Sequence, residues 1–155
     1  MLSESDVRVM CNGGESGTVE FKLKAPRPAE VAERICGMAN TRTGGTIIFG
    51  VKDETGEIVG LSALNLSIDI VLRAARMIKP PVVLADSGGE THTIDGKTLL
   101  VVPVPANNGT LYQASGIFWL RRGSFTTPMN MDEISGHLQT TGTLHYNGCL
   151  PTRDD

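Results

Sequence analysis

Three acidic residues in the first half of the chain could hold a divalent metal ion. Glu15 lies in a glycine-containing turn, and Glu20 follows shortly after it. Asp53 follows a short run of apolar residues of the kind found in buried strands. Three carboxylates brought together form a hard-oxygen site suited to Mg²⁺ or Mn²⁺, which would polarise a phosphodiester and activate a water. Lys22, two residues after Glu20, could neutralise phosphate charge. The alternative interpretation is a surface strand decorated with ordinary charges.

A glycine-containing loop over residues 40–45 is the second candidate. It contains Asn40 and Arg42, and Gly44-Gly45 lead into the apolar run. Such a loop can present backbone N–H groups to a phosphate. The GxxxxGK[ST] and GxGxxG patterns of known phosphate loops are absent. The alternative is a helix that ends at a glycine stop.

The third candidate is the pair Arg121-Arg122 followed by Gly123-Ser124, at the end of a strand-like segment. Two guanidinium groups beside a hydroxyl suit a phosphate or a nucleic-acid backbone. Neighbouring residues of a strand point to opposite faces, so we expect only one of the two arginines to join a given site. The alternative is a solvated sheet edge.

These residues depend on strands and helices that the sequence pattern predicts. Residues 18–24 alternate in polarity and predict a half-buried strand. Its apolar face carries Val19, Phe21 and Leu23, and its predicted solvent face carries Glu20, Lys22 and Lys24. Lys24 is therefore a further candidate for phosphate contact.

The remaining elements predict an α/β or α+β domain with one mixed sheet and three to four helices. Capping-box patterns mark helix starts at Ser3 and Asn130, Pro28 suits a helix start, and Asp95-Gly96 suits a hairpin turn. Helices are expected at 4–13, 28–40, 67–78 and 130–139, and further strands at 46–51, 57–61, 82–85, 91–94, 98–104 and 116–122.

Composition bounds the functional class. The chain has 155 residues, 14 Lys and Arg against 17 Asp and Glu, and a net charge of −3, with 18 glycines. The pI of about 5.6 argues against a generally basic nucleic-acid protein and leaves room for a local basic patch. The length predicts one domain over 1–139 with a polar tail at 140–155.

Cysteine usage and the chain start point to a cytoplasmic protein. Three widely spaced cysteines indicate neither a disulfide framework nor a zinc site, and His145 with Cys149 make a weak pair of metal ligands. Cys36 fits the apolar side of a helix. No apolar stretch reaches the length of a membrane span, and the first residues are acidic where a signal peptide is basic.

Six segments, taken together and in this order, resemble the Schlafen AlbA-type domain over about residues 7–138. They are Glu15-Ser16-x-x-Val19-Glu20-Phe21-Lys22, Ala39-Asn40-Thr41, the run from Gly44 to Asp53, Gly56-Glu57-Ile58-Val59-Gly60, the 95–105 hairpin with Val102-x-Val104-Pro105, and Leu120-Arg121-x-Gly123-Ser124.

The resemblance implies an α/β fold and nucleic-acid binding, and many bacterial members are labelled as transcriptional regulators or ATP-binding proteins. In animal Schlafen proteins the similar domain is a metal-dependent endonuclease acting on tRNA and rRNA. Its acids match Glu15 and Glu20. Asp53 is our choice for the third, with Glu54 as the alternative, because Lys52 stands where many members have Asp.

Three hypotheses follow, and we place a nucleic-acid-binding regulatory module first. A divalent-metal-dependent endoribonuclease is the second, and a nucleotide-binding module is the third. The animal nuclease clamps RNA between two related lobes. Since this chain has one, a comparable clamp would require a homodimer.

Overall fold

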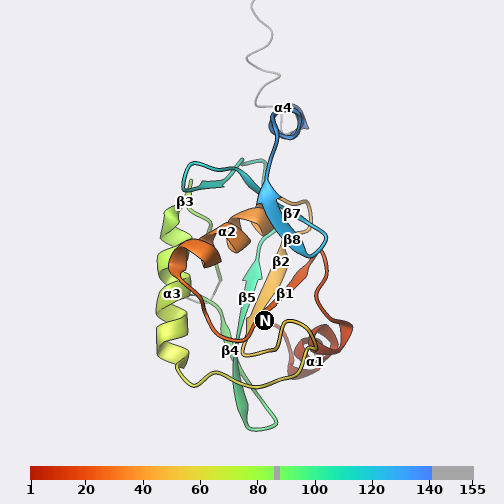
Figure 1. Cartoon of the computed structure of the whole chain (residues 1–155), viewed down its shortest axis with the longest axis vertical. Helices are drawn as coiled ribbons and strands as arrows, with labels where there is room; N and C mark the ends of the chain where they lie inside the picture. The colour runs from red at the N-terminus through yellow and green to blue at the C-terminus, as the bar shows by residue number, and fades with distance from the viewer. Residues whose placement is uncertain (86–87, 141–155) are drawn as a thin grey trace, which may run out of the picture.

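A four-stranded mixed sheet forms the centre of the computed structural model, which describes residues 1–85 and 88–140. Its strand order is β1 (Val19–Lys22), β2 (Gly45–Phe49), β5 (Lys97–Val104) and β4 (Glu90–Ile94). β1 and β2 run parallel, and the other pairs are antiparallel. The predicted α+β domain with a mixed sheet is confirmed (Figure 1).

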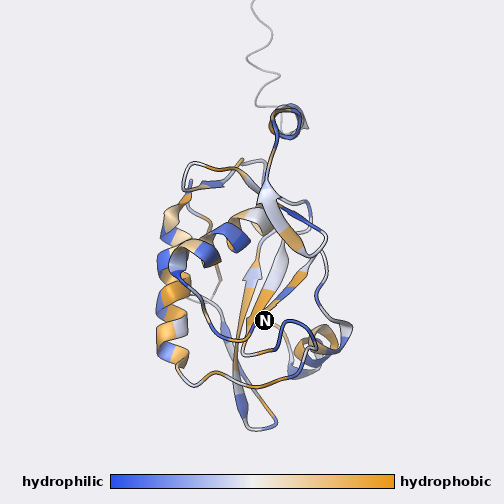
Figure 2. Cartoon of the chain, in the orientation of Figure 1, coloured by the Kyte–Doolittle hydropathy of each residue, from blue (hydrophilic) through white to orange (hydrophobic). Residues whose placement is uncertain are grey.

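Helices cover both faces of this sheet. Alternate residues of β2 point to opposite sides: Ile47 and Phe49 pack under α2 (Pro28–Ala39) and α3 (Leu64–Met77), and Ile48 packs toward α1 (Glu4–Gly13). Figure 2 shows the hydrophobic colouring of the central strands. The short continuous apolar run predicted a strand buried on both sides, and the structure confirms it.

Local signals fixed two of the helix starts. Ser3 and Asp6 form the predicted capping box at the start of α1. Pro28 occupies the first turn of α2, where its missing N–H costs nothing. By contrast, α3 begins three residues before the predicted Ser67, and its N-cap residue Ala63 makes no side-chain hydrogen bond. No capping residue marks that start in the sequence.

The hairpin between β4 and β5 has the predicted two-residue turn. Asp95 and Gly96 have φ values of 52° and 75°, as a type I′ turn requires.

The strands predicted at 57–61 and 82–85 are wrong. The first contributes one isolated bridge, between Val51 and Ile58. The second is irregular, and the two-residue strand β3 (Ile78–Lys79) precedes it and pairs with β6 (Gln113–Ala114).

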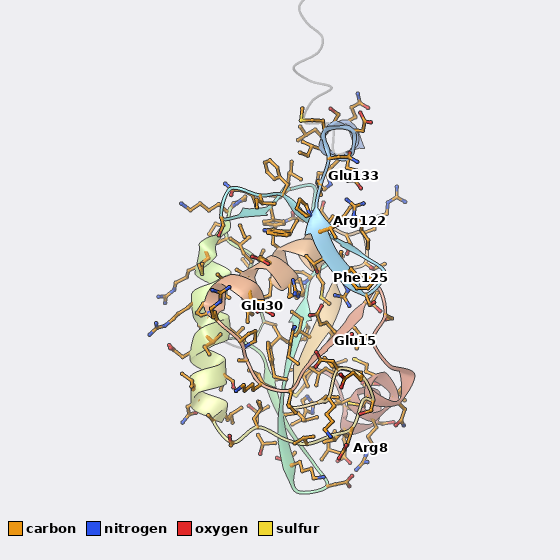
Figure 3. All side chains as sticks on the ribbon, in the orientation of Figure 1. Arg8, Glu15, Glu30, Arg122, Phe125 and Glu133 are labelled. Atoms are coloured by element: carbon orange, nitrogen blue, oxygen red, sulfur yellow. The ribbon has the colours of Figure 1, made fainter. Side chains whose placement is uncertain are left out.

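A second ribbon follows, and it carries the last helix. β7 (Trp119–Arg122) pairs with β8 (Phe125–Pro128) across a two-residue turn, whereas the sequence predicted one longer strand at 116–122. α4 (Met131–Thr140) begins at the predicted Asn130 cap. It stands apart from the sheet at the end of the ribbon (Figures 1 and 3).

Two further observations bear on the predictions. Cys36 is fully buried among apolar residues of α2, as predicted. No helix in the described part of the chain is long and apolar enough to span a membrane. His145 and Cys149, with the tail from residue 141, lie outside the described residues.

Candidate functional site

Glu20 lies inside the protein, and the prediction that its strand face is exposed is wrong. The alternation itself is correct, because Phe21 packs toward α1 and Glu20 points the other way. That second face is covered by α2, so Glu20 keeps only 4% of its surface. Alternation defines the two faces of a strand, and the packing of other elements decides which of them meets water.

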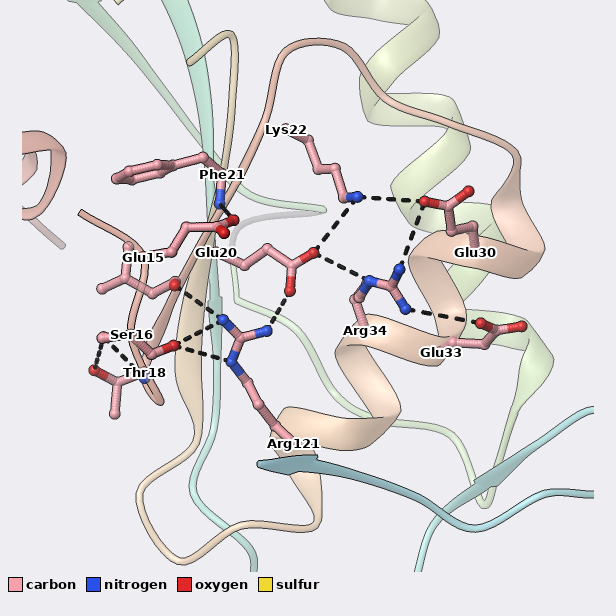
Figure 4. A network of polar contacts seen from close by, with 11 residues as sticks. Glu15, Ser16, Thr18, Glu20, Phe21, Lys22, Glu30, Glu33, Arg34 and Arg121 are labelled. Atoms are coloured by element: carbon pink, nitrogen blue, oxygen red, sulfur yellow. Dashed lines mark hydrogen bonds and ion pairs between the residues drawn. The ribbon is translucent and has the colours of Figure 1, made fainter. Parts of the chain in front are cut away.

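Three cations surround the Glu20 carboxylate (Figure 4). Oε1 accepts a hydrogen bond from Arg121, Oε2 accepts one from Arg34 Nε at 3.1 Å, and Lys22 Nζ lies 3.6 Å from Oε2. Lys22 also pairs with Glu30 of α2 at 3.3 Å. A buried carboxylate needs such partners because burying an unpaired charge is costly. Lys22 is therefore held between two carboxylates.

Arg121 braces the second ribbon against the start of β1. Its side chain is 0% exposed and donates to the backbone carbonyl oxygens of Ser16 and Val19 as well as to Glu20. The hydrogen bonds to Ser16 are 3.2 and 2.7 Å long, and the one to Val19 is 3.0 Å long. The arginine predicted to contact phosphate is thus occupied by protein partners.

Glu15 is close enough to both Glu20 and Asp53 to feel their charges, but the three carboxylates do not gather around an ion site. Glu15 Oε2 accepts a hydrogen bond from the Phe21 amide at 2.9 Å. Burial raises the pKa of the Glu15 carboxyl; the charges of Glu20 and Asp53 add to this rise, and the Phe21 hydrogen bond and Arg121 oppose it. Among residues 1–85 and 88–140, no three His, Cys, Asp or Glu side chains form a group that could hold a metal ion. As arranged, the three acids do not fit Mg²⁺ or Mn²⁺, because both Glu20 oxygens already face cations.

Asn40 is a buried junction between α2 and the second ribbon. Its Nδ2 donates to the carbonyl oxygens of Tyr112 and Trp119 at 2.9 and 2.8 Å, and its Oδ1 accepts from Tyr112 N at 2.9 Å. Every polar atom of this side chain is satisfied inside the protein. Asn40 therefore positions the following loop and does not face a ligand.

The two glycines of the loop allow close backbone approach. Gly44 has a φ of +66°, and a Cβ there would lie 2.3 Å from the Val104 carbonyl oxygen. A Cβ at Gly45 would lie 2.7 Å from Met38 Sδ. The Gly44 amide donates to Thr41 Oγ1 at 3.0 Å, so it is not directed at a ligand. Close packing therefore accounts for the absence of a side chain at both positions.

Three turns meet beside the starts of β1 and β2 (Figure 1). Thr46 N donates to Thr18 O at 2.8 Å, and a Cβ at Gly17 would lie 3.9 Å from Gly123 O, which places the 15–18, 41–45 and 123–125 turns side by side. We call their exposed residues the loop-tip surface. They are Ser16, Gly17, Thr18, Arg42, Thr43, Gly123, Ser124 and Phe125.

The loop-tip surface contains two of the predicted residues, Arg42 and Ser124. Lys24 is exposed but lies elsewhere, along a groove of about 280 Å³ that Leu61 and Leu66 also line. Sequence reasoning missed Phe125, since the strand that carries it was not predicted. It also missed the hydroxyl residues of the 15–18 turn, although their closeness to glycines was a visible signal.

The fold and site define an α+β domain with helices on both faces of a mixed sheet and a braced ribbon at one end. The family described as Schlafen, AlbA_2 matches residues 15–130 of this chain. The chain belongs to this family, which the sequence resemblance predicted.

Two solved structures have similar folds. The DIP2311 protein from Corynebacterium diphtheriae superimposes with a TM-score of 0.61 at 22% identity, over 80% of this chain and 24% of that one. This chain thus spans about a quarter of the length of the DIP2311 protein. The N-terminal domain of a protein from Nitrosomonas europaea related to the ATP-dependent DNA helicase RecG gives 0.50 at 24% identity, over 84% of this chain and 94% of that one. No curated protein matches the chain.

Proposed function

We propose that this domain binds nucleic acid through contacts of its loop-tip surface with the phosphate backbone. The observation that carries the proposal is Arg42, an exposed cation without an ion-pair partner among the described residues, which lies in the turn beside Thr18 and Thr46. Arginine, hydroxyl groups and backbone amides are the groups that make most protein contacts with phosphate. The helicase-related name of one structural neighbour and the family resemblance support the same function.

The charge balance favours a modest interaction whose affinity depends only weakly on salt. About half of the arginines and lysines in the described part are paired with acids, as Lys22, Arg34 and Arg122 are. Each phosphate contact contributes about 0.9 to the slope of log K against log salt on duplex DNA. With a net charge of −3, few such contacts are available, so we expect a shallow slope.

A matched pair of variants tests this proposal. Arg42→Ala removes the cation of the loop-tip surface, and Arg76→Ala removes another exposed cation, near the end of α3, that has no ion-pair partner among the described residues. Fluorescence anisotropy with labelled single-stranded and duplex oligonucleotides, at about 50 and 200 mM salt, gives affinity and slope. We expect Arg42→Ala to weaken binding several-fold and to reduce the slope by about 1, with Arg76→Ala unchanged.

Equal effects of the two variants would contradict the assignment to this surface, and no binding by the unaltered domain would contradict the function itself. The proposal includes a cytoplasmic location and a homodimer, in which two loop-tip surfaces could act on one nucleic acid. Sedimentation equilibrium tests the dimer. The endoribonuclease and nucleotide-binding alternatives gain no support from the arrangement of the described residues.

A further inference from the structure

Phe125 is the most exposed aromatic side chain that the structure describes, with 71% of its surface accessible. It is the first residue of β8, directly after the Gly123-Ser124 turn. A single exposed apolar residue needs no explanation by itself. Its position does, because Phe125 directly follows Ser124 in one of the three neighbouring turns that form the loop-tip surface, which also carries Arg42.

The ribbon holds the ring outward. Phe125 pairs directly with Arg122 across the ribbon, so the two side chains share one face. The other face meets α2, where a Cβ at Gly37 would lie 2.7 Å from Thr126 Cγ2. Arg122 is fixed by Glu133 and by Thr127 Oγ1, at 2.5 Å from its Nε. Figure 3 shows Phe125 and Arg122 on the ribbon and Glu133 on the helix beyond it.

An outward ring beside backbone-binding groups suits one ligand chemistry in particular. Aromatic rings on single-strand-binding proteins stack on bases, while neighbouring cations and hydroxyls follow the backbone. In a duplex the bases are already stacked on each other, so a protein ring on the surface finds no free base face. The position of Phe125 therefore favours a single strand over a duplex.

We infer that the loop-tip surface binds single-stranded nucleic acid, with one unstacked base lying on the ring of Phe125. The inference rests on the proposed function and specifies its ligand class. Arg42 would hold the backbone and Phe125 would hold the base. A second copy of this chain or another protein could instead cover the ring, and the test below distinguishes that outcome.

Phe125→Leu is the decisive variant because it keeps an apolar side chain and removes the π face. Phe125→Tyr keeps the ring and serves as its matched control. The probe is a labelled deoxythymidine oligonucleotide of about 12 nucleotides, within the span of known single-strand sites. Loss of one base stack by substitution costs about 5- to 150-fold in affinity. We expect a loss in this range for Phe125→Leu, near-unaltered binding for Phe125→Tyr, and a larger effect on the single strand than on a duplex of the same length.

An abasic oligonucleotide of equal length separates the two roles. The unaltered domain should bind the abasic probe about as weakly as Phe125→Leu binds the deoxythymidine probe. Arg42→Ala should weaken binding to both probes. If Arg42→Ala weakens binding and Phe125→Leu does not, the proposed function stands and the stacking inference is overturned. If Phe125→Leu changes the sedimentation coefficient and leaves the affinity unaltered, the ring is a protein contact and the inference is also overturned. Equal melting temperatures of the variants show that each one folds.

Discussion

Arg121 and Arg122 are neighbours in sequence, yet the structure uses them in opposite ways. The Arg121 side chain is 0% exposed and pairs with buried Glu20, whereas the Arg122 side chain is 41% exposed and pairs with Glu133. Both contacts join a guanidinium to a carboxylate. The difference lies in the medium around them, because the inner pair is shielded from solvent and the outer pair is screened. The inner pair braces the fold, and the outer pair lies on an exposed face of the ribbon.

Removing the inner guanidinium should have the largest effect on stability. Arg121→Met leaves Glu20 buried with only Arg34 and Lys22 nearby, and frees the carbonyl oxygens of Ser16 and Val19. Breaking a buried ion pair from one side typically costs about 3–5 kcal/mol. Urea denaturation, followed by circular dichroism, measures the loss in unfolding free energy.

Arg122→Met is the matched control on the outer face, where exposed pairs contribute at most about 1 kcal/mol. The double variant Glu20→Gln with Arg121→Met should recover part of the loss, because it removes the uncompensated charge. Equal losses of unfolding free energy for Arg121→Met and Arg122→Met would contradict the expectation that the buried pair stabilises the fold more than the exposed pair.

Asn40→Ala should have the next largest effect. It leaves the Tyr112 amide and two carbonyl oxygens without their present partners, and an unpaired buried group costs about 1–3 kcal/mol. Arg42→Ala, two residues further along the same loop, should change stability by less than about 0.5 kcal/mol. Thermal unfolding compares the two. If Asn40→Ala kept full stability and lost only nucleic-acid affinity, Asn40 would be a nucleic-acid contact and not a structural residue.

The contrast between local and distant contacts also explains which features could be predicted from the sequence. Features encoded within a few residues were predictable, such as the Ser3 cap, the apolar run of β2 and the Asp95-Gly96 turn. The burial of Glu20 was not, because its covering residues lie on another element. Its partner Arg121 follows it by 101 residues. Alternation within a segment carries no information about such distant packing.

The candidate site was predicted in part for the same reason. Arg42 and Ser124 lie on the loop-tip surface as residues of short glycine-containing turns, which a local pattern can indicate. Phe125 was missed because β8 is four residues long and ends in proline, so it has too few residues for a clear alternating pattern. Asn40 matched a family segment, but its role depends on backbone groups more than 70 residues away.

The ion pair between Arg122 and Glu133 should make the stability of the fold depend on pH in the acidic range. Arg122 and the Asn130 amide lower the pKa of Glu133 from its ordinary 4.5 to about 2. A lowered folded-state pKa means that the stabilisation is present above pH 4.5 and is lost as the pH falls toward 2. We therefore expect the melting temperature of the unaltered domain to exceed that of Glu133→Gln near neutral pH, with the gap closing over this window. A gap independent of pH would show that the charge of Glu133 does not matter.

Glu15 should give the smallest effect, and with the opposite sign. Burial raises its pKa above the ordinary 4.5, and the Phe21 hydrogen bond counteracts part of that rise. A raised folded-state pKa means that the protonated carboxyl favours folding, so the benefit is present below pH 4.5 and is lost as the pH rises through the folded-state value. Glu15→Gln keeps an acceptor for the Phe21 amide and removes the titration. The melting temperature of the unaltered domain relative to Glu15→Gln should thus fall with rising pH, whereas relative to Glu133→Gln it should rise. Slopes of the same sign would mean that the cations around Glu20, and not burial, control the charge of Glu15.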